Sequence, residues 1–135
     1  MTKQVIILVL GGAGYILIEL LWRGRTHPTM FFAGGISFLL VHTVSFVFKN
    51  SSILTKAIIS GMSITVVELI FGVVFNLLFD FGVWDYSSQP FNFLGQICPL
   101  FTVAWCFASF VFIPLERFLN RLIDKKLLAN RKNNV

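Results

Sequence analysis

Ionisable side chains inside long apolar segments are the first feature of this sequence that could perform chemistry. Glu68 lies about 12 residues into one apolar run, and Glu19 and His42 lie within two others. If these runs cross a membrane, a charge near the bilayer centre costs roughly 2.5–3.5 kcal/mol or more, so such residues are functional candidates. We interpret Glu68 and His42 as candidates for proton coupling. The structural alternative is a hydrogen bond from Glu68 to His42 or Tyr15.

A basic segment follows the first apolar run. The letters "RGRTHPT" at 23–29 supply Arg23, Arg25 and His27, which are suited to attracting an anionic group. Glu19 precedes Arg23 by four residues, so the two side chains would meet on one helical face and form an ion pair. Glu19 is therefore either part of a ligand site with these residues or a structural partner of the arginines.

The most polar segment of the first 115 residues is "FGVWDYSSQPFNFLGQ" at 81–96. It offers Trp84, Asp85, Tyr86 and Asn92 for ligand binding. Non-helical backbone near a membrane is tolerated when it is buried in protein or lines water, so we expect a folded cap between two helices. Two interpretations stay open: a ligand site shared with the basic segment, or a structural lid pinned to its arginines.

No motif of a catalytic, metal or nucleotide-binding centre occurs in the chain. HExxH, GxSxG, the P-loop and metal-spaced sets of Cys or His are all absent from the sequence. We predict no catalytic residue, no metal and no cofactor. An intramembrane enzyme or a lipid-binding protein that uses Asp85, His27 and an arginine remains an alternative.

The composition identifies the physical class of the protein. Of 135 residues, 56% are hydrophobic and 13% are charged, and the mean hydropathy is +0.83. A soluble domain of this length cannot bury so much apolar surface, so the chain is predicted to be an integral membrane protein in contact with the lipid bilayer. The net charge of +5 does not indicate nucleic-acid binding, because the basic residues cluster at the ends of apolar runs.

Four apolar runs are long enough to cross a bilayer, which takes roughly 20 residues. The predicted spans are 4–22, 29–48, 57–79 and 97–115, followed by a basic cytoplasmic tail at 116–135. We therefore expect an all-α membrane protein that forms a single domain over 1–135, with two helical hairpins and a structured outer loop between helices three and four. Pro28 and Pro90 are expected to mark helix starts, which would place Asn92 near a first helical turn.

The distribution of Lys and Arg predicts the orientation. With both termini inside, nine of the 11 basic residues lie on the cytoplasmic side and only two on the other, which favours an N-in/C-in topology. Leu115, Phe118, Leu119 and Leu122 share one face of the tail, which predicts an amphipathic helical extension at the membrane surface, bent near Pro114. A docking surface for a partner protein is the alternative interpretation of this face.

Small and polar residues recur along one face of each predicted helix. In the third span this face carries Gly61, Thr65, Glu68, Gly72 and Asn76. Converging faces of this kind would line a polar path through a helix bundle. Close helix packing, which also requires small residues, is the structural alternative.

The sequence resembles a known family in "WDYSSQPFNFLGQICPLF" at 84–101, in "GYILIELLWRGRTHPTM" at 14–30 and in the "VEL" of the third span. These segments are similar to the small bacterial membrane proteins catalogued as putative ABC-transporter permeases of type IV. The resemblance covers nearly the whole chain. It implies transport in a bacterial cytoplasmic membrane, and an ATPase would have to be a separate subunit because this chain has no P-loop.

These observations favour a small membrane transporter, channel or permease subunit that moves a small solute, of which an anion is one possibility. Four helices enclose little volume, so we expect a homo-oligomer or a partner membrane or ATPase subunit. The alternatives are the intramembrane enzyme or lipid-binding protein described above, and a non-catalytic accessory subunit.

Overall fold

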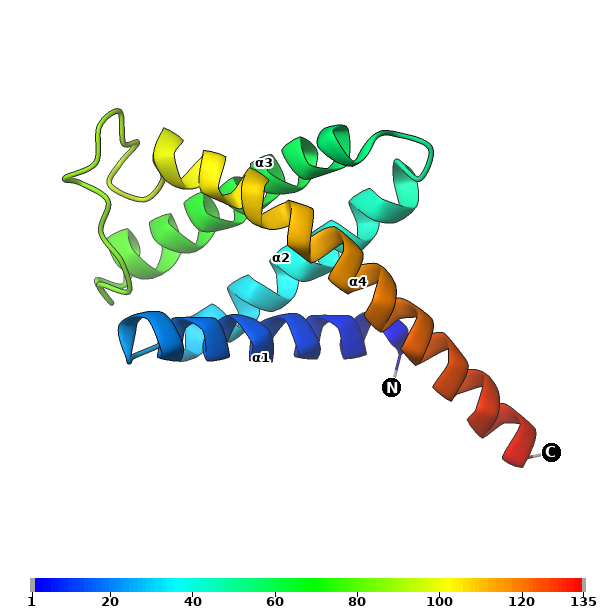
Figure 1. The fold of residues 1–135 in the computed structure, drawn as a ribbon. Coiled ribbons are helices and arrows are strands. Elements are labelled where there is room, and N and C mark those ends of the chain that lie inside the picture. Colours follow the sequence, from blue (N-terminus) through cyan, green and yellow to red (C-terminus); the bar gives the residue numbers. More distant parts are fainter. Residues whose placement is uncertain (1, 135) are drawn as a thin grey trace.

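The computed structural model describes residues 2–134 and consists of four long helices, which confirms the predicted all-α membrane fold (Figure 1). The helices are α1 (Lys3–Arg23), α2 (Pro28–Val47), α3 (Ile53–Phe71) and α4 (Pro99–Asn133), and the π-helix η1 (Gly72–Leu78) continues α3. All four are long and apolar enough to span a membrane. Within residues 2–134 the structure has no β-strand, only an isolated bridge between Phe93 and Ile97.

The helices form the two predicted hairpins. Helix α1 packs along α2, α3 packs along α4, and α2 also contacts both helices of the second hairpin. Both chain termini lie toward one end of the bundle, and the α1–α2 joint and the α3–α4 loop lie at the other, which we call the loop end (Figure 1). At the opposite end the Lys3 ammonium pairs with the Asp124 carboxylate at 2.8 Å, which ties α1 to α4.

Glycines allow α1 and α2 to approach closely. A Cβ atom at Gly34 would collide with the Cβ of Tyr15, and one at Gly12 would collide with the backbone carbonyl of Phe31. Side chains at these positions would therefore push the two helices apart. Here the small-residue stripes serve helix packing, as membrane helices commonly require.

The turn between α1 and α2 contains the helix start that the sequence predicts. Helix α1 ends at Gly24, whose φ of 67° suits a glycine, and α2 begins with Pro28 at its first position, as expected. The Nδ1 atom of His27 accepts a hydrogen bond from the Thr29 amide at 3.3 Å and so caps α2.

The expectation that Pro90 starts a helix is wrong. Pro90 and Asn92 lie in a turn, and α4 begins only at Pro99. Phe91 and Leu94 both adopt a φ of 55°, which a right-handed helix cannot contain. From Pro99 the helix continues through Pro114 to Asn133, so the predicted extension is a direct continuation of the fourth span.

Candidate functional site

The loop between η1 and α4 is held to the bundle by Asn76, which lies on the π-helix. The Asn76 Oδ1 atom accepts a hydrogen bond from the Val83 amide at 2.7 Å. Its Nδ2 group donates to the Trp84 carbonyl at 3.1 Å and to Oε1 of Gln96 at 2.8 Å. One buried side chain therefore fixes the loop at three points, and π-helical turns frequently occur at functional sites.

The remainder of the loop is folded on itself. Asn92 donates hydrogen bonds to the carbonyls of Ser87 and Gln89 and accepts one from the Gly95 amide at 2.9 Å. Asp85 accepts a hydrogen bond from the Ser87 amide at 2.8 Å, and this bond lowers the pKa of the carboxyl group. These contacts agree with the predicted folded cap. The side chains of Asp85 and Asn92 form hydrogen bonds within this cap.

The expected ion pair between Glu19 and Arg23 is present. The Arg23 guanidinium donates to Glu19 Oε1 at 2.6 Å and to the Val83 carbonyl at 3.3 Å. The Thr26 hydroxyl donates to the second oxygen of Glu19 at 2.7 Å. The pair therefore satisfies its own charges and also connects α1 to the α3–α4 loop.

Glu68 is paired differently from either alternative considered from the sequence. Its Oε1 atom accepts a hydrogen bond from the hydroxyl of Tyr86 at 3.1 Å, across from the folded loop. The side chain is buried, with 9% of the residue exposed. Among residues 2–134, no group donates to its Oε2 atom, and the Nε1 group of Trp105 is also buried without an acceptor. The Trp105 indole nevertheless lies beside the Glu68 carboxylate, so the neighbours of this acid are two neutral donors, Tyr86 and Trp105.

Tyr86 is held as a hydrogen-bond donor. Burial and the nearby charge of Glu68 raise the pKa of its hydroxyl well above the usual value, so the proton stays on the phenol. The Tyr86 ring stacks on that of Phe101, with centroids 4.5 Å apart. This ring pair places the hydroxyl against Glu68.

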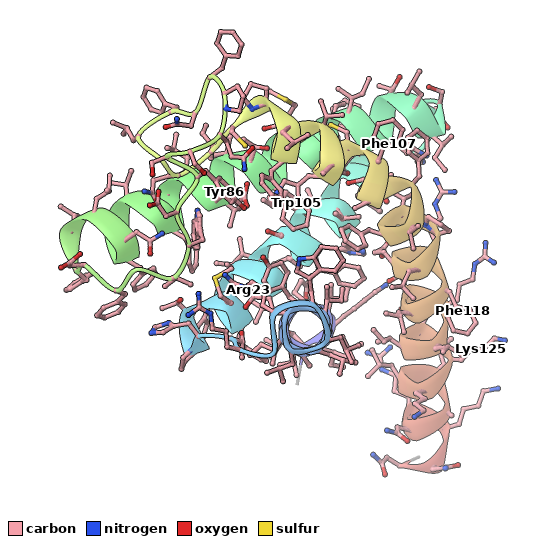
Figure 2. All side chains as sticks on the ribbon, turned by 60° about the vertical axis from the view of Figure 1, so that its left-hand side comes forward. Arg23, Tyr86, Trp105, Phe107, Phe118 and Lys125 are labelled. Carbon is pink, nitrogen blue, oxygen red and sulfur yellow. The ribbon has the colours of Figure 1, made fainter. Side chains whose placement is uncertain are left out.

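These groups surround a cavity between α1 and α4 at the loop end, with a volume of about 610 Å³. Five of the residues predicted for a ligand site line it: Glu19, Arg23, Glu68, Trp84 and Tyr86. Figure 2 shows Arg23, Tyr86 and Trp105 turned toward this space from three different elements, whereas Phe107, Phe118 and Lys125 point away from it. We call this space the loop-end cavity.

The other predicted residues lie elsewhere. Arg25 is exposed, and His27 caps α2 with its ring 5.3 Å from that of Phe81. His42 lies in the other half of the bundle, where its Nδ1 atom is 2.6 Å from Glu116 Oε1. Glu116, which is only 2% exposed, was missed because it begins the segment interpreted as a basic tail. The only sequence signal was one acid directly after the last apolar run.

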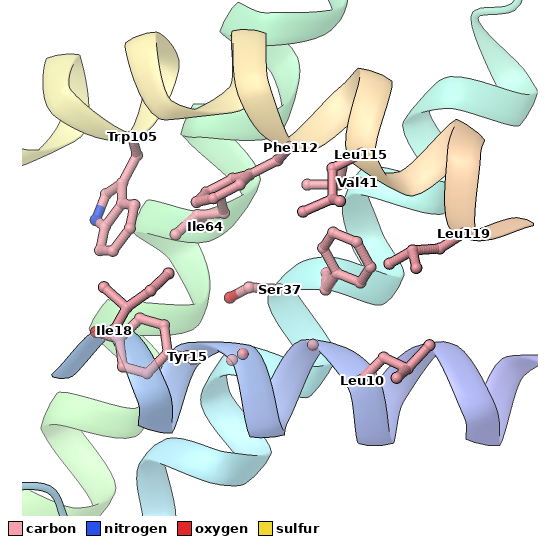
Figure 3. A pocket seen from close by; sticks show the side chains of 14 residues that line it. Leu10, Tyr15, Ile18, Ser37, Val41, Ile64, Trp105, Phe112, Leu115 and Leu119 are labelled. Atoms are coloured by element: carbon pink, nitrogen blue, oxygen red, sulfur yellow. The ribbon is translucent and has the colours of Figure 1, made fainter. Parts of the chain in front are cut away.

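A second, smaller cavity adjoins the first. It has a volume of about 110 Å³ and lies between α1 and α4 against α2, and its walls are almost entirely apolar (Figure 3). Tyr15, Ile18, Trp105 and Phe112 line both cavities. The loop-end cavity therefore borders an apolar cavity toward the middle of the bundle, with these four side chains between them.

The charges in the loop-end cavity are one arginine and two glutamates. Because Arg23 is paired with Glu19, the group left to interact with a ligand is Glu68. In the part of the chain that the structure describes, no three His, Cys, Asp or Glu residues are arranged to hold a metal ion. The cavity therefore combines one carboxylate that has no cationic partner with several aromatic walls.

A family model described as "Putative ABC-transporter type IV" matches residues 7–133. No curated protein and no solved structure matches the chain.

Proposed function

This chain belongs to the "Putative ABC-transporter type IV" family, and from that membership we propose that it is the membrane subunit of a transport system that holds its solute in the loop-end cavity. The observation that carries the proposal is the cavity itself. Its volume lies within the range of roughly 300–1,000 Å³ typical of small-molecule sites, and its polar groups are few and convergent.

The unsatisfied groups at the cavity wall support a binding role. A buried carboxylate oxygen or indole N–H without a partner costs free energy in a folded protein. Glu68 Oε2 and Trp105 Nε1 both lack a well-formed hydrogen bond, and both residues line the same cavity. Because the indole lies beside the carboxylate, a solute would recover this cost by displacing one of these side chains from the other.

The arrangement in the membrane follows from the basic residues. With nine of 11 Lys and Arg on the cytoplasmic side, the loop end and its cavity face away from the cytoplasm, and both termini lie inside. The long basic end of α4 is then available to a cytoplasmic ATPase, because the chain itself has no P-loop. A second copy or another membrane subunit would complete the path.

Transport can be tested without knowing the solute, because a transport cavity must open to both sides of the membrane in turn. We would replace Ala104, which lines the cavity, with cysteine after changing Cys98 and Cys106 to alanine. Membrane-impermeant thiol reagents applied to either side of sealed, oriented vesicles, with the partner subunits present, should each label the Ala104→Cys variant.

Val103→Cys is the matched control. Val103 directly precedes Ala104 on α4, its side chain is exposed, and it does not line the cavity. It should react poorly with water-soluble reagents from both sides. Labelling of Ala104→Cys from one side only would overturn transport through this cavity and favour a static accessory subunit.

A further inference from the structure

We propose that the loop-end cavity binds a lipophilic organic cation, such as a quaternary ammonium or phosphonium compound, with Glu68 as its counter-charge. This inference names the solute class for the site described above, and so it rests on the proposed function. It replaces the anionic solute that the isolated sequence suggested from Arg23, Arg25 and His27.

The charge balance of the lining carries the first step. Arg23 is already bound to Glu19 at 2.6 Å and to the Val83 carbonyl, and the remaining oxygen of Glu19 is bound to Thr26. An anion that approaches the guanidinium would also meet the Glu19 carboxylate that already balances its charge. Glu68 has no cationic partner, because its neighbours are the neutral donors Tyr86 and Trp105. The lining, with one arginine and two glutamates, is therefore negative overall.

Aromatic rings are the commonest side chains in the lining that contains this carboxylate. Tyr86 stacks on Phe101 at 4.5 Å, and Tyr15 lies with its ring centroid 6.2 Å from that of Trp105. Trp84 also lines the cavity. Ring faces attract cations, most strongly when water is excluded, and such aromatic surroundings are suited to weakly hydrated quaternary cations.

The apolar character of the walls sets the second property of the ligand. The small cavity that adjoins the site is lined by groups such as Leu10, Ile64 and Leu115 (Figure 3). A small hydrated ion would gain nothing there, whereas the hydrocarbon substituents of an organic cation would be removed from water or headgroups. Together the two cavities favour a bulky, apolar molecule with one positive charge.

Binding of three probes of similar chemistry and different charge tests the inference. Equilibrium dialysis of the purified full-length chain would use tetraphenylphosphonium, neutral triphenylphosphine oxide and anionic tetraphenylborate, and only saturable binding would be counted. We expect saturable binding of tetraphenylphosphonium, at least tenfold weaker binding of the neutral compound, and no saturable binding of tetraphenylborate.

Glu68→Gln should weaken tetraphenylphosphonium binding at least tenfold, because it removes the charge while keeping an acceptor for Tyr86. Glu68→Asp, which keeps the charge, should bind better than Glu68→Gln and so guards against a general folding defect. Asp80→Asn is the matched control: it removes a carboxylate at the loop end outside the lining, and asparagine tolerates the φ of 54° found there. It should leave binding unchanged.

The outcomes separate this inference from the proposed function. Saturable binding of tetraphenylborate, binding of no probe, or equal binding by wild type and Glu68→Gln would each overturn the cation site. Two-sided labelling of Ala104→Cys alongside any of these results would leave transport standing with another solute. Charge-selective binding with labelling from one side only would keep the cation site and remove transport.

Discussion

The Asn76→Ala substitution is expected to release the loop that forms one wall of the cavity. Asn76 makes hydrogen bonds with the Val83 amide, the Trp84 carbonyl and the Gln96 side chain, and alanine can make none of them. The loop carries Trp84 and Tyr86, which line the cavity. The substitution should therefore disorder this wall of the cavity while leaving the Glu68 side chain itself unchanged.

The magnitude follows from the burial of the groups left behind. Val83 and Gln96 are 7% and 4% exposed, so each would keep an unsatisfied polar group, at about 1–3 kcal/mol each. The Trp84 carbonyl belongs to a half-buried residue, and water can replace its lost partner. The free energy that keeps the loop folded on the bundle should therefore fall by about 2–6 kcal/mol.

Amide hydrogen exchange of residues 79–98 in detergent or nanodiscs measures this loss directly. The reporter is the Tyr86 amide, which bonds to the Gly95 carbonyl at 2.7 Å and not to Asn76. A loss of 2 kcal/mol, the lower bound, corresponds to about a 30-fold faster exchange there, since 1.4 kcal/mol is a factor of ten. Ser63→Ala is the control: it removes only a hydrogen bond to the Ile59 carbonyl of its own helix and should change loop exchange less than twofold. An Asn76→Ala protein whose Tyr86 amide exchanges within about threefold of the wild-type rate would refute the reasoning.

Three further perturbations test other parts of the structure. Gly34→Leu should separate the first hairpin, because even a Cβ atom there collides with α1; a lower midpoint of thermal unfolding than that of the wild type would show it, and an unchanged midpoint would contradict it. Glu116→Leu should destabilise the protein by roughly 3 kcal/mol by leaving His42 unpaired, and a double-mutant cycle with His42→Leu should be non-additive; additive losses would argue against the pair. Asp85 has a pKa lowered by the Ser87 amide, so its contribution is present above its ordinary pKa near 3.8 and is lost as the pH falls through the lower folded value. Asp85→Asn should therefore flatten the loss of stability toward pH 3 seen by thermal unfolding, and an unchanged pH profile would exclude this role.

Local sequence signals predicted the helices and the contacts within one helix. Apolar length located the four spans, and the four-residue spacing of Glu19 and Arg23 predicted their ion pair. The expected helix start at Pro90 was wrong, because proline occurs in turns as readily as in the first turn of a helix. The two positive φ angles that exclude a helix there belong to phenylalanine and leucine, residues that give no sequence signal for that conformation.

Contacts between distant segments could not be predicted. The pairing of His42 with Glu116 joins residues 74 apart, and neither has a local partner that would indicate it. Three aromatic residues of the cavity lining were not predicted as ligand-site residues, because they look like ordinary aromatic residues of membrane helices: Tyr15, Phe101 and Trp105. Only the packing of the two hairpins brings their rings around Glu68.

The most direct test of the account is the tryptophan fluorescence of the protein, since all three of its tryptophans line the loop-end cavity. Titration of tetraphenylphosphonium into the purified Ala104→Cys variant, with excitation at the red edge of tryptophan absorption, should give a saturable change in emission. Prior reaction of the new cysteine with a bulky, membrane-permeant maleimide should abolish that change by filling the cavity, whereas Val103→Cys modified to the same extent by this apolar reagent should keep it. A saturable change that survives modification at residue 104, or no saturable change at all, would contradict the claim that this cavity is the binding site.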